Sequence, residues 1–181
     1  KLEIAGSIIE RCGGQGVYTE APATIDATLV RDIEFSAQGR ARGIEGNGDS
    51  GEDMTVAITR SVIERAGDVG VGMLGLHATL ENVVVRDTNP RAVPVYQAGV
   101  GFVVATKIGG PRGSAQIATS FFDNNRFSAV ALLAADGEID RVWVRNTAPD
   151  VTTGLGGRGI SLSYDTESGE GARASVVRSL V

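Results

Sequence analysis

The chain has 181 residues, of which 42% are hydrophobic, and this length is sufficient for one domain with a buried core. The formal net charge of −5 comes from residues of both signs, which argues against a nucleic-acid-binding protein and favours a solvated surface. No apolar run reaches the roughly 20 residues that a membrane-spanning helix needs, so no membrane span is predicted.

A short apolar motif opens the chain and recurs along it. The first copy is Ile-Ala-Gly-Ser-Ile-Ile-Glu-Arg, residues 4–11, with aliphatic side chains at its first, fifth and sixth positions and charges at its seventh and eighth. Further copies begin at Ile25, Ile58, Leu80, Ile117, Ile139 and Val176. Residues that favour strands fill each copy, and glycine or polar residues flank it. The motif therefore predicts a repeat architecture built from short strands.

A second element follows most copies of the motif and consists of a small residue before an aliphatic one. It occurs as Gly16-Val17, Gly43-Ile44, Gly70-Val71, Gly99-Val100, Ala129-Val130 and Gly159-Ile160. An apolar residue often follows two positions later, which is the period of a strand. The glycine suits a position where the backbone turns tightly or approaches a neighbour. Strands this short cannot bury their apolar faces alone, so successive units are expected to stack.

Short and long units alternate because insertions fall at two turns of every second unit. The first set of insertions follows the charged pair and covers residues 33–42, 88–98 and 147–158; the second follows the glycine-aliphatic strand and covers 46–54, 104–114 and 163–172. Insertions gathered on one face of a repeat protein often form its binding surface.

Stacking in register makes each motif position a column of residues about 4.8 Å apart. The first and sixth columns are apolar in every copy and are predicted to point inward. The seventh column alternates in sign, and so do the first four members of the eighth; the seventh reads Glu10, Arg31, Glu64, Arg86, Asp123 and Arg145, and the eighth begins with Arg11, Asp32, Arg65 and Asp87. Opposite charges attract at this spacing, so the alternation predicts that the units touch in this register.

The fifth column is apolar although it adjoins the inward sixth column. Alternation along a strand turns it outward, as a stripe of Ile8, Leu29, Val62, Val84, Phe121, Trp143 and Leu180. Either a bend in the backbone buries both columns, or a loop or a partner covers the stripe. We expect that a loop or a partner covers this stripe.

These repeats resemble the right-handed parallel β-helix repeats of the pectate-lyase-like superfamily, which share the unit length and the order of aliphatic, polar and glycine-aliphatic segments. The resemblance implies an all-β fold: a single-stranded right-handed parallel β-helix of about 6 to 7 coils, with short and long coils alternating. Residues 1–181 are expected to form one domain and to be a fragment of a longer repeat protein. The superfamily also implies an extracellular or cell-surface location.

Enzymes of that superfamily cleave acidic polysaccharides, using Ca²⁺ ligands and an arginine in lyases or two or three carboxylates in hydrolases. Outward positions of the glycine-aliphatic strands hold one acid, Glu45, and the single histidine, His77, is interpreted as a turn residue. No catalytic site is predicted. The best remaining acidic set occupies the second motif position of alternate units, where Arg60 and Arg141 could neutralise it; it consists of Asp26, Glu81 and Asp140.

The second set of insertions carries the charged candidates for binding. They are Asp49, Glu52 and Asp53 in the first loop, Lys107 and Arg112 in the middle loop, and Asp165, Glu167 and Glu170 in the last. The oxygen-rich segment Gly46–Asp53 could bind Ca²⁺, but it matches no defined calcium loop, and a solvated turn is the preferred interpretation. No metal site or cofactor is predicted. The opposite charge of the middle loop predicts complementary neighbours.

Two functional hypotheses follow. The first is a non-catalytic β-helix segment of a larger secreted or cell-surface bacterial protein, acting as a structural scaffold or binding a carbohydrate or a partner. The alternative is a polysaccharide lyase or glycoside hydrolase whose site is incomplete or lies partly outside this segment. Terminal coils with no cap also predict end-to-end or edge self-association.

Overall fold

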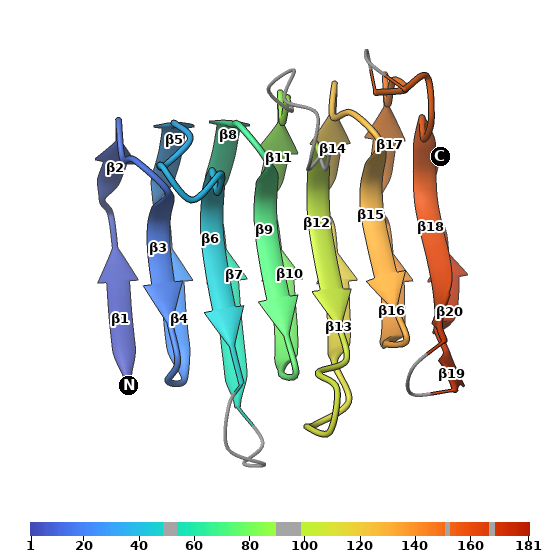
Figure 1. Ribbon diagram of the computed structural model, residues 1–181. Coiled ribbons are helices and arrows are strands. Elements are labelled where there is room, and N and C mark those ends of the chain that lie inside the picture. Colours follow the sequence, from blue (N-terminus) through green and yellow to red (C-terminus); the bar gives the residue numbers. More distant parts are fainter. Residues whose placement is uncertain (49–53, 90–98, 151–152, 167–168) are drawn as a thin grey trace.

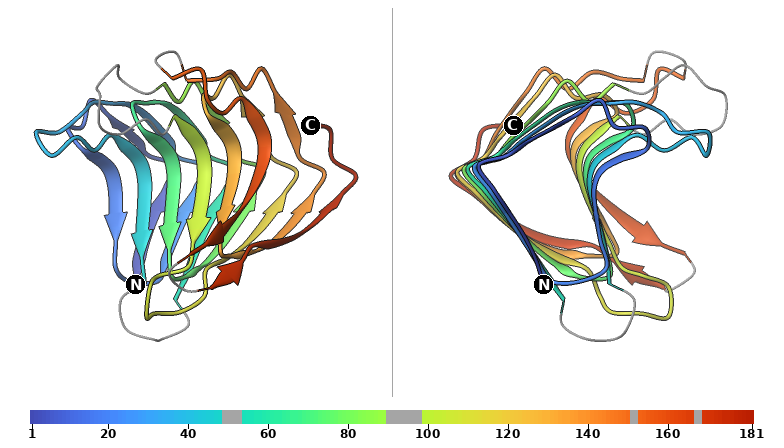
Figure 2. Two further views of the ribbon diagram at one scale, coloured as in Figure 1. Left: turned by 45° about the vertical axis from the view of Figure 1, so that its right-hand side comes forward. Right: turned by 90° about the vertical axis from the view of Figure 1, so that its left-hand side faces the viewer.

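A computed structural model describes residues 1–181 except 49–53, 90–98, 151–152 and 167–168. All of its regular elements are strands, and the chain winds through three sheets in turn (Figure 1). Among the described strands, every pairing between successive coils is parallel, and one antiparallel pair joins β18 (Arg158–Asp165) and β19 (Glu170–Gly171). In the right-hand view of Figure 2 the chain runs clockwise as it recedes from its N-terminal coil, so the coil is right-handed. The fold is a parallel β-helix, as the repeat predicts.

The first sheet holds the strand that ends on the first and second motif positions. It consists of β1 (Leu2–Ala5), β4 (Ala23–Asp26), β7 (Thr55–Thr59), β10 (His77–Glu81), β13 (Ser114–Ala118), β16 (Asp136–Asp140) and β20 (Arg173–Val177). The second sheet holds the fifth to seventh positions. It consists of β2 (Ile8–Glu10), β5 (Leu29–Ile33), β8 (Val62–Ala66), β11 (Val84–Arg86), β14 (Phe121–Asp123) and β17 (Trp143–Arg145).

The third sheet holds the glycine-aliphatic strands. It consists of β3 (Gln15–Thr19), β6 (Arg42–Asn47), β9 (Val69–Leu74), β12 (Val100–Ala105), β15 (Ser128–Leu133), β18 (Arg158–Asp165) and β19 (Glu170–Gly171). Figure 2 shows the connections at residues 34–41 and 106–113 projecting beyond opposite edges of this sheet. These two insertions, one from each set, therefore flank one side of the molecule.

The predicted register is confirmed in the first and second sheets. Ile25 pairs with Ile4 and Ile58 in the first sheet, and Val30 pairs with Ile9 and Ile63 in the second. Inward side chains of all three sheets form one continuous core. Its largest fully buried members include Ile25, Ile44, Ile58, Ile63, Leu80, Phe102, Ile117, Phe122 and Ile139.

Two motif positions make the sharp bends between sheets. At the third position the backbone takes a positive φ in every copy, through Gly6, Ala27, Arg60, Asn82, Thr119, Arg141 and Arg178. At the eighth it does so through Arg11, Asp32, Arg65, Asp87, Asn124 and Asn146. Few non-glycine residues adopt this conformation, and Asn and Asp adopt it most readily. The chain thus leaves the first and second sheets at fixed positions of the repeat.

The third sheet corrects one alignment from the sequence. Phe102, and not Val100, pairs with Val71 and Val130, so the small residue of the fourth coil is Gly101 rather than Gly99. A β-carbon built at Gly70 would lie 2.5 Å from the Gly101 carbonyl oxygen, so the backbone at Gly70 lies too close to the next coil for a side chain. The outward residue that follows is consequently Val103.

The fifth motif column faces outward, as alternation predicts. Ile8 and Trp143 are 67% and 62% exposed, and Leu29, Val62 and Phe121 are half-buried. No loop in the described part of the chain covers the two ends of this stripe, so the expected cover by loops is wrong there. Cover by a partner stays a prediction.

Candidate functional site

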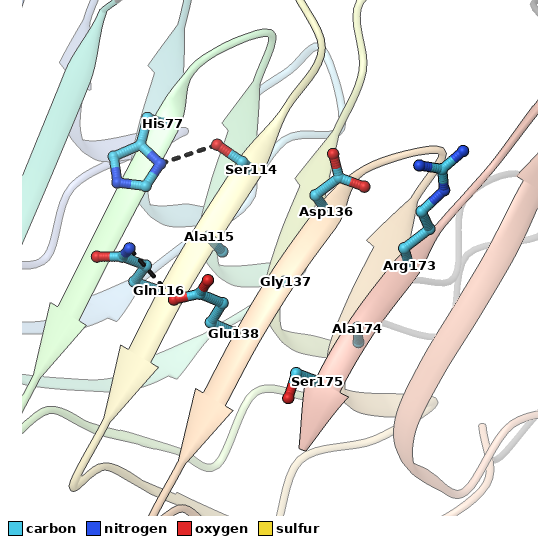
Figure 3. Close-up of a pocket in the computed structure, with 10 residues that line it drawn as sticks. All are labelled: His77, Ser114, Ala115, Gln116, Asp136, Gly137, Glu138, Arg173, Ala174 and Ser175. Carbon is cyan, nitrogen blue, oxygen red and sulfur yellow. Dashed lines mark hydrogen bonds between the residues drawn. The ribbon is translucent and has the colours of Figure 1, made fainter. Parts of the chain in front are cut away.

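A polar pocket of about 530 Å³ lies on the outer face of the first sheet. His77, Ser114, Asp136 and Arg173 occupy the same position in the neighbouring strands β10, β13, β16 and β20. Two residues further along, Gln116, Glu138 and Ser175 form a second row on the same face. Figure 3 shows both rows across the pocket. The alternating pattern of the strands, with Ala115 and Ile117 buried, turns both rows toward solvent.

Hydrogen bonds tie neighbouring members of these rows together. The Nδ1 atom of His77 lies 2.8 Å from the Ser114 Oγ atom, and Gln116 Nε2 donates to Glu138 Oε2 over 3.3 Å. His77 is the first residue of β10, so its interpretation as a turn residue is wrong. The rows form a nearly continuous strip of donors and acceptors across β10, β13 and β16.

Arg112 anchors the middle loop against this pocket. Its Nε and Nη2 atoms each donate to the Asp136 carboxylate over 2.8 Å, and it also pairs with Glu170 and donates to the Gly171 carbonyl oxygen over 2.9 Å. The Arg112 guanidinium holds the pKa of Asp136 below its ordinary value. The predicted complementary charges of the middle and last loops are therefore confirmed for Arg112 and Glu170.

The His77–Ser114 pair has the spacing of a general base and a nucleophile, but no carboxylate among the described residues binds the second nitrogen of His77. In a Ser-His-Asp triad the carboxylate binds the second nitrogen of the histidine. Here Asp136 lies on the far side of Ser114, in the next strand, and binds Arg112 instead. Within the described residues, His77 Nε2 has no hydrogen-bond partner. This arrangement supports ligand binding better than nucleophilic catalysis.

The acidic set from the second motif position is dispersed and mostly ion-paired. Thr59 separates Asp26 from Glu81 in the ladder, and Ala118 separates Glu81 from Asp140. A hydrogen bond from Arg60 and a weaker contribution from a Thr59 hydrogen bond lower the pKa of Asp26 to about 2. Arg178 donates to both oxygens of Asp140, over 2.8 and 2.7 Å, and Arg141 contacts it at 3.2 Å. Carboxylates held ionised in this way are poor general acids.

The loop candidates are only partly within the described residues. Asp49, Glu52, Asp53 and Glu167 lie outside them, and so does most of the segment that could bind Ca²⁺. Lys107 lies in the connection between β12 and β13, where its carbonyl oxygen accepts from Gly110 N over 2.9 Å, and Asp165 ends β18. In the part of the chain that the structure describes, no three His, Cys, Asp or Glu side chains are grouped to hold a metal ion. Ca²⁺ binding by the first loop remains a prediction.

A second polar cluster lies on the outer face of the third sheet. Glu45 and Asp68 are both buried, and Arg42 pairs with the two of them, with its Nε atom 3.6 Å from Asp68. Gln15 also donates to Glu45. Burial raises the pKa of the Asp68 carboxyl, and Arg42 opposes that effect. The acid that sequence reasoning singled out in this sheet, Glu45, is thus neutralised by a residue three positions before it in the same strand.

Sequence reasoning missed the row across the pocket, although a signal for it exists. His77, Ser114, Asp136 and Arg173 each lie three residues before the first motif position, where alternation predicts an outward side chain. This column belongs to the same strand as the first motif position but precedes the apolar motif, so the repeat of the motif does not reveal it.

Comparisons with known proteins identify the fold. No protein-family model matches the chain, and no curated protein sequence is significantly similar to it. Among solved structures, the crystal structure of pectate lyase Pel9A matches with a TM-score of 0.60 and 10% sequence identity. The match covers 92% of this chain and 48% of that one, so this chain spans about half the length of the pectate lyase. At that identity the likeness is one of fold, and the chain shares the parallel β-helix of pectate lyase Pel9A.

Proposed function

We propose that this chain is a non-catalytic parallel β-helix segment of a larger secreted or cell-surface protein, and that it binds an extended polysaccharide on the outer face of its first sheet. The observation that carries the proposal is the row of His77, Ser114, Asp136 and Arg173 across four neighbouring strands. Strand spacing sets these side chains about 4.8 Å apart along the axis of the coil.

Such a row suits a long ligand that carries many hydroxyl groups. Each strand adds one or two hydrogen-bonding side chains, so a linear ligand lying across the strands would meet a donor or acceptor at each step. The rows combine neutral groups, such as Ser114, Gln116 and Ser175, with charged groups that are already partnered, such as Asp136. Repeat proteins bind extended ligands on surfaces of this kind.

The arginine partners of the acidic side chains support the non-catalytic part of the proposal. Arg60 and Arg178 keep Asp26 and Asp140 ionised, and Arg112 does the same for Asp136. A general acid needs a pKa raised toward the working pH, whereas each of these is lowered.

A polysaccharide lyase or glycoside hydrolase is the second candidate function. The fold likeness to pectate lyase Pel9A favours it, and the chain covers 48% of that protein, so catalytic groups outside this segment would complete the site. The enzyme would cleave a polysaccharide, whereas the binding segment would not, and the samples used for binding can also be tested for cleavage.

Binding would be measured by affinity electrophoresis and calorimetry against a panel of acidic and neutral polysaccharides. Gln116→Ala is the test variant, and Thr24→Ala is its matched control, because Thr24 occupies the same row in β4, outside the pocket. We expect Gln116→Ala to weaken binding of one polysaccharide class by about fivefold and Thr24→Ala to leave it unchanged. Absence of binding to every polysaccharide would contradict the proposal. Release of unsaturated or new reducing ends would favour the enzyme.

We also propose that copies of residues 1–181, taken as an isolated segment, associate end to end through the last coil. Val176 is 47% exposed although its inner-coil equivalent Ile139 is 1% exposed, and Leu162, Leu180 and Val181 are exposed beside it. Uncovered strand edges and apolar ends pair readily with other chains. Sedimentation velocity should show the mass rising with concentration, and Val176→Lys should reduce that rise. A monomer at every concentration would refute this association.

A further inference from the structure

The aromatic end of the fifth-column stripe forms a second pocket, on the second sheet and away from the proposed polysaccharide surface. Its volume is about 470 Å³, and it is lined by Thr119, Ser120, Phe121, Arg141, Trp143 and Arg145. This size lies within the range of small-molecule sites. The pocket is therefore a second candidate binding site.

Two aromatic rings make a corner in this pocket. The Phe121 and Trp143 rings lie in neighbouring strands with centroids 6.5 Å apart and planes inclined by 68°. The Arg145 guanidinium lies 4.8 Å from the Phe121 ring centroid, and Asp123 binds that guanidinium over 2.8 Å. The Arg145 guanidinium thus covers one face of the Phe121 ring, while the Trp143 side chain stays largely exposed. A third flat ring can stack on the indole in the arrangement that aromatic groups prefer.

The charges around this corner leave a surplus of positive charge. Three guanidinium groups, of Arg141, Arg145 and Arg178, surround two carboxylates, of Asp123 and Asp140. Arg178 occupies both oxygens of Asp140, which leaves Arg141 a single contact at 3.2 Å. Arg141 also lines the pocket, and its side chain is 53% exposed. A planar guanidinium in this state is suited to bind a carboxylate of a ligand through paired hydrogen bonds.

We infer that this pocket binds a small aromatic carboxylate, whose ring packs against Trp143 and Phe121 and whose carboxylate pairs with Arg141. Two neighbouring coils supply the groups that bind this ligand. Phe121 lies in β14 of one coil, whereas Trp143 lies in β17 of the next and Arg141 lies at the bend just before β17. An uncharged ring would offer no carboxylate to Arg141, and an acid without a flat ring would lose the stacking. Binding therefore needs the two groups in one ligand.

The test uses the one tryptophan of the chain as its reporter, because Trp143 lies in the pocket. The probe is 3-phenylpropanoate. Its two matched controls are 3-phenylpropanamide, which has the ring without the charge, and 3-cyclohexylpropanoate, which has the charge without the flat ring. We expect a saturable change in tryptophan fluorescence with the probe and binding at least about fivefold weaker for each control.

The variants are matched in backbone conformation. Arg141→Asn removes the guanidinium at a bend with positive φ, and Asn82 already holds that bend in another coil. Arg11→Asn is the control, because Arg11 lies at the eighth-position bend, where Asn124 and Asn146 occur naturally. Phe121→Leu keeps an apolar side chain and removes one ring, so it tests the aromatic corner independently.

Arg141→Asn is expected to raise the dissociation constant of 3-phenylpropanoate about tenfold, and Arg11→Asn to leave it unchanged. Phe121→Leu is expected to weaken the probe more than it weakens 3-cyclohexylpropanoate. Circular dichroism and the unfolding midpoint confirm that each variant is folded. A response that does not saturate, equal binding by Arg141→Asn and Arg11→Asn, or equal binding of the probe and either control compound would overturn the inference.

Discussion

Glu64 and Arg86, which lie one coil apart, are joined by two hydrogen bonds to a single carboxylate oxygen. The Nε and Nη2 atoms of Arg86 donate to Glu64 Oε2 over 2.8 and 2.5 Å, and Arg65 donates to the other oxygen over 2.5 Å. Glu64 is only 5% exposed. Burial by itself would raise the pKa of Glu64, but the two arginines outweigh it and lower that pKa. The alternating charges that predict the register thus become a nearly buried ion cluster in the middle of the ladder.

Replacing Glu64 tests how much this ladder stabilises the register. Glu64→Gln should lower the free energy of unfolding by about 1–3 kcal/mol, because Arg65 and Arg86 lose a charged acceptor that lies at a buried position. Glu64→Lys should cost roughly 3–5 kcal/mol, because it places three cations in successive layers with Arg31 and Arg86. Urea unfolding measures both. Glu3→Gln, in an exposed pair with Lys1, serves as the control and should show no measurable change. Equal effects of Glu64→Gln and Glu3→Gln would contradict the stabilising role.

Serine hydroxyls at the fourth motif position close the bend between the first and second sheets. Ser61 is buried; its Oγ donates to the Thr59 carbonyl oxygen over 2.7 Å and accepts from Thr28 N over 3.1 Å. Ser61→Ala should lower the free energy of unfolding by about 1–3 kcal/mol, because it strands a buried backbone N–H. Ser7 makes only the first kind of bond, at the exposed N-terminal coil. Denaturant unfolding of Ser7→Ala should therefore show a loss below about 0.5 kcal/mol.

The close approach of coils in the third sheet predicts a strong effect of one methyl group. A β-carbon at Gly70 would lie 2.5 Å from both the Gly101 carbonyl oxygen and Val85 Cγ1. Gly70→Ala should thus destabilise the fold by about 3 kcal/mol, because neither the ladder nor the core can move aside freely. Gly13 has open space around its β-carbon position and no positive φ, so Gly13→Ala should change stability by less than about 0.5 kcal/mol. Thermal unfolding distinguishes the two variants, and similar midpoints would disprove the close approach.

The Asp26–Arg60 pair predicts a defined dependence of stability on pH. Arg60 lowers the pKa of Asp26 from 3.8 to about 2 in the folded state. A lowered folded-state pKa contributes stability above the unfolded value and loses it as pH falls through the folded value. The contribution of Asp26 should therefore be complete above about pH 5 and disappear between about pH 4 and pH 2. Unfolding curves at several pH values should show a smaller acid loss for Asp26→Asn than for the unaltered chain.

Glu81→Gln is the control for this pH profile. Glu81 holds the same motif position as Asp26 but makes no ion pair among the described residues. Its profile should match that of the unaltered chain. An Asp26→Asn profile that is identical to both would show that the pair does not contribute.

The sequence predicted the fold and the register of two sheets because their columns repeat without ambiguity. Aliphatic residues at the first and sixth positions align only one way, and the alternating charges of Glu10, Arg31 and Glu64 exclude a shift by one coil. In the third sheet, the segment from Gly99 to Val104 contains two glycines and several apolar residues, so two alignments satisfy the pattern. The strand pairing in the structure, in which Phe102 lies beside Val71 and Val130, selects the correct one.

The candidate sites were harder to predict because they depend on which side chains become neighbours in space. Asp26, Glu81 and Asp140 share a motif position, yet the arginine partners of Asp26 and Asp140 come from the neighbouring coil or bend. His77 and Ser114 are 37 residues apart in sequence and become hydrogen-bonded only through the stacking of β10 on β13. The sequence placed the apolar stripe on the outside of the second sheet but could not show that Phe121 and Trp143 form a corner.

The sequence by itself determined the coil and its register, because inward aliphatic columns and alternating charges are periodic properties that every coil repeats. Only the tertiary structure decided which carboxylates are neutralised, which glycine meets the next coil and which polar and aromatic side chains share a pocket. These features depend on contacts of a few ångströms between coils, and such contacts differ from one layer to the next. The periodic pattern predicts the features that all coils share. Both proposed binding surfaces, by contrast, depend on side chains that occur only in particular coils.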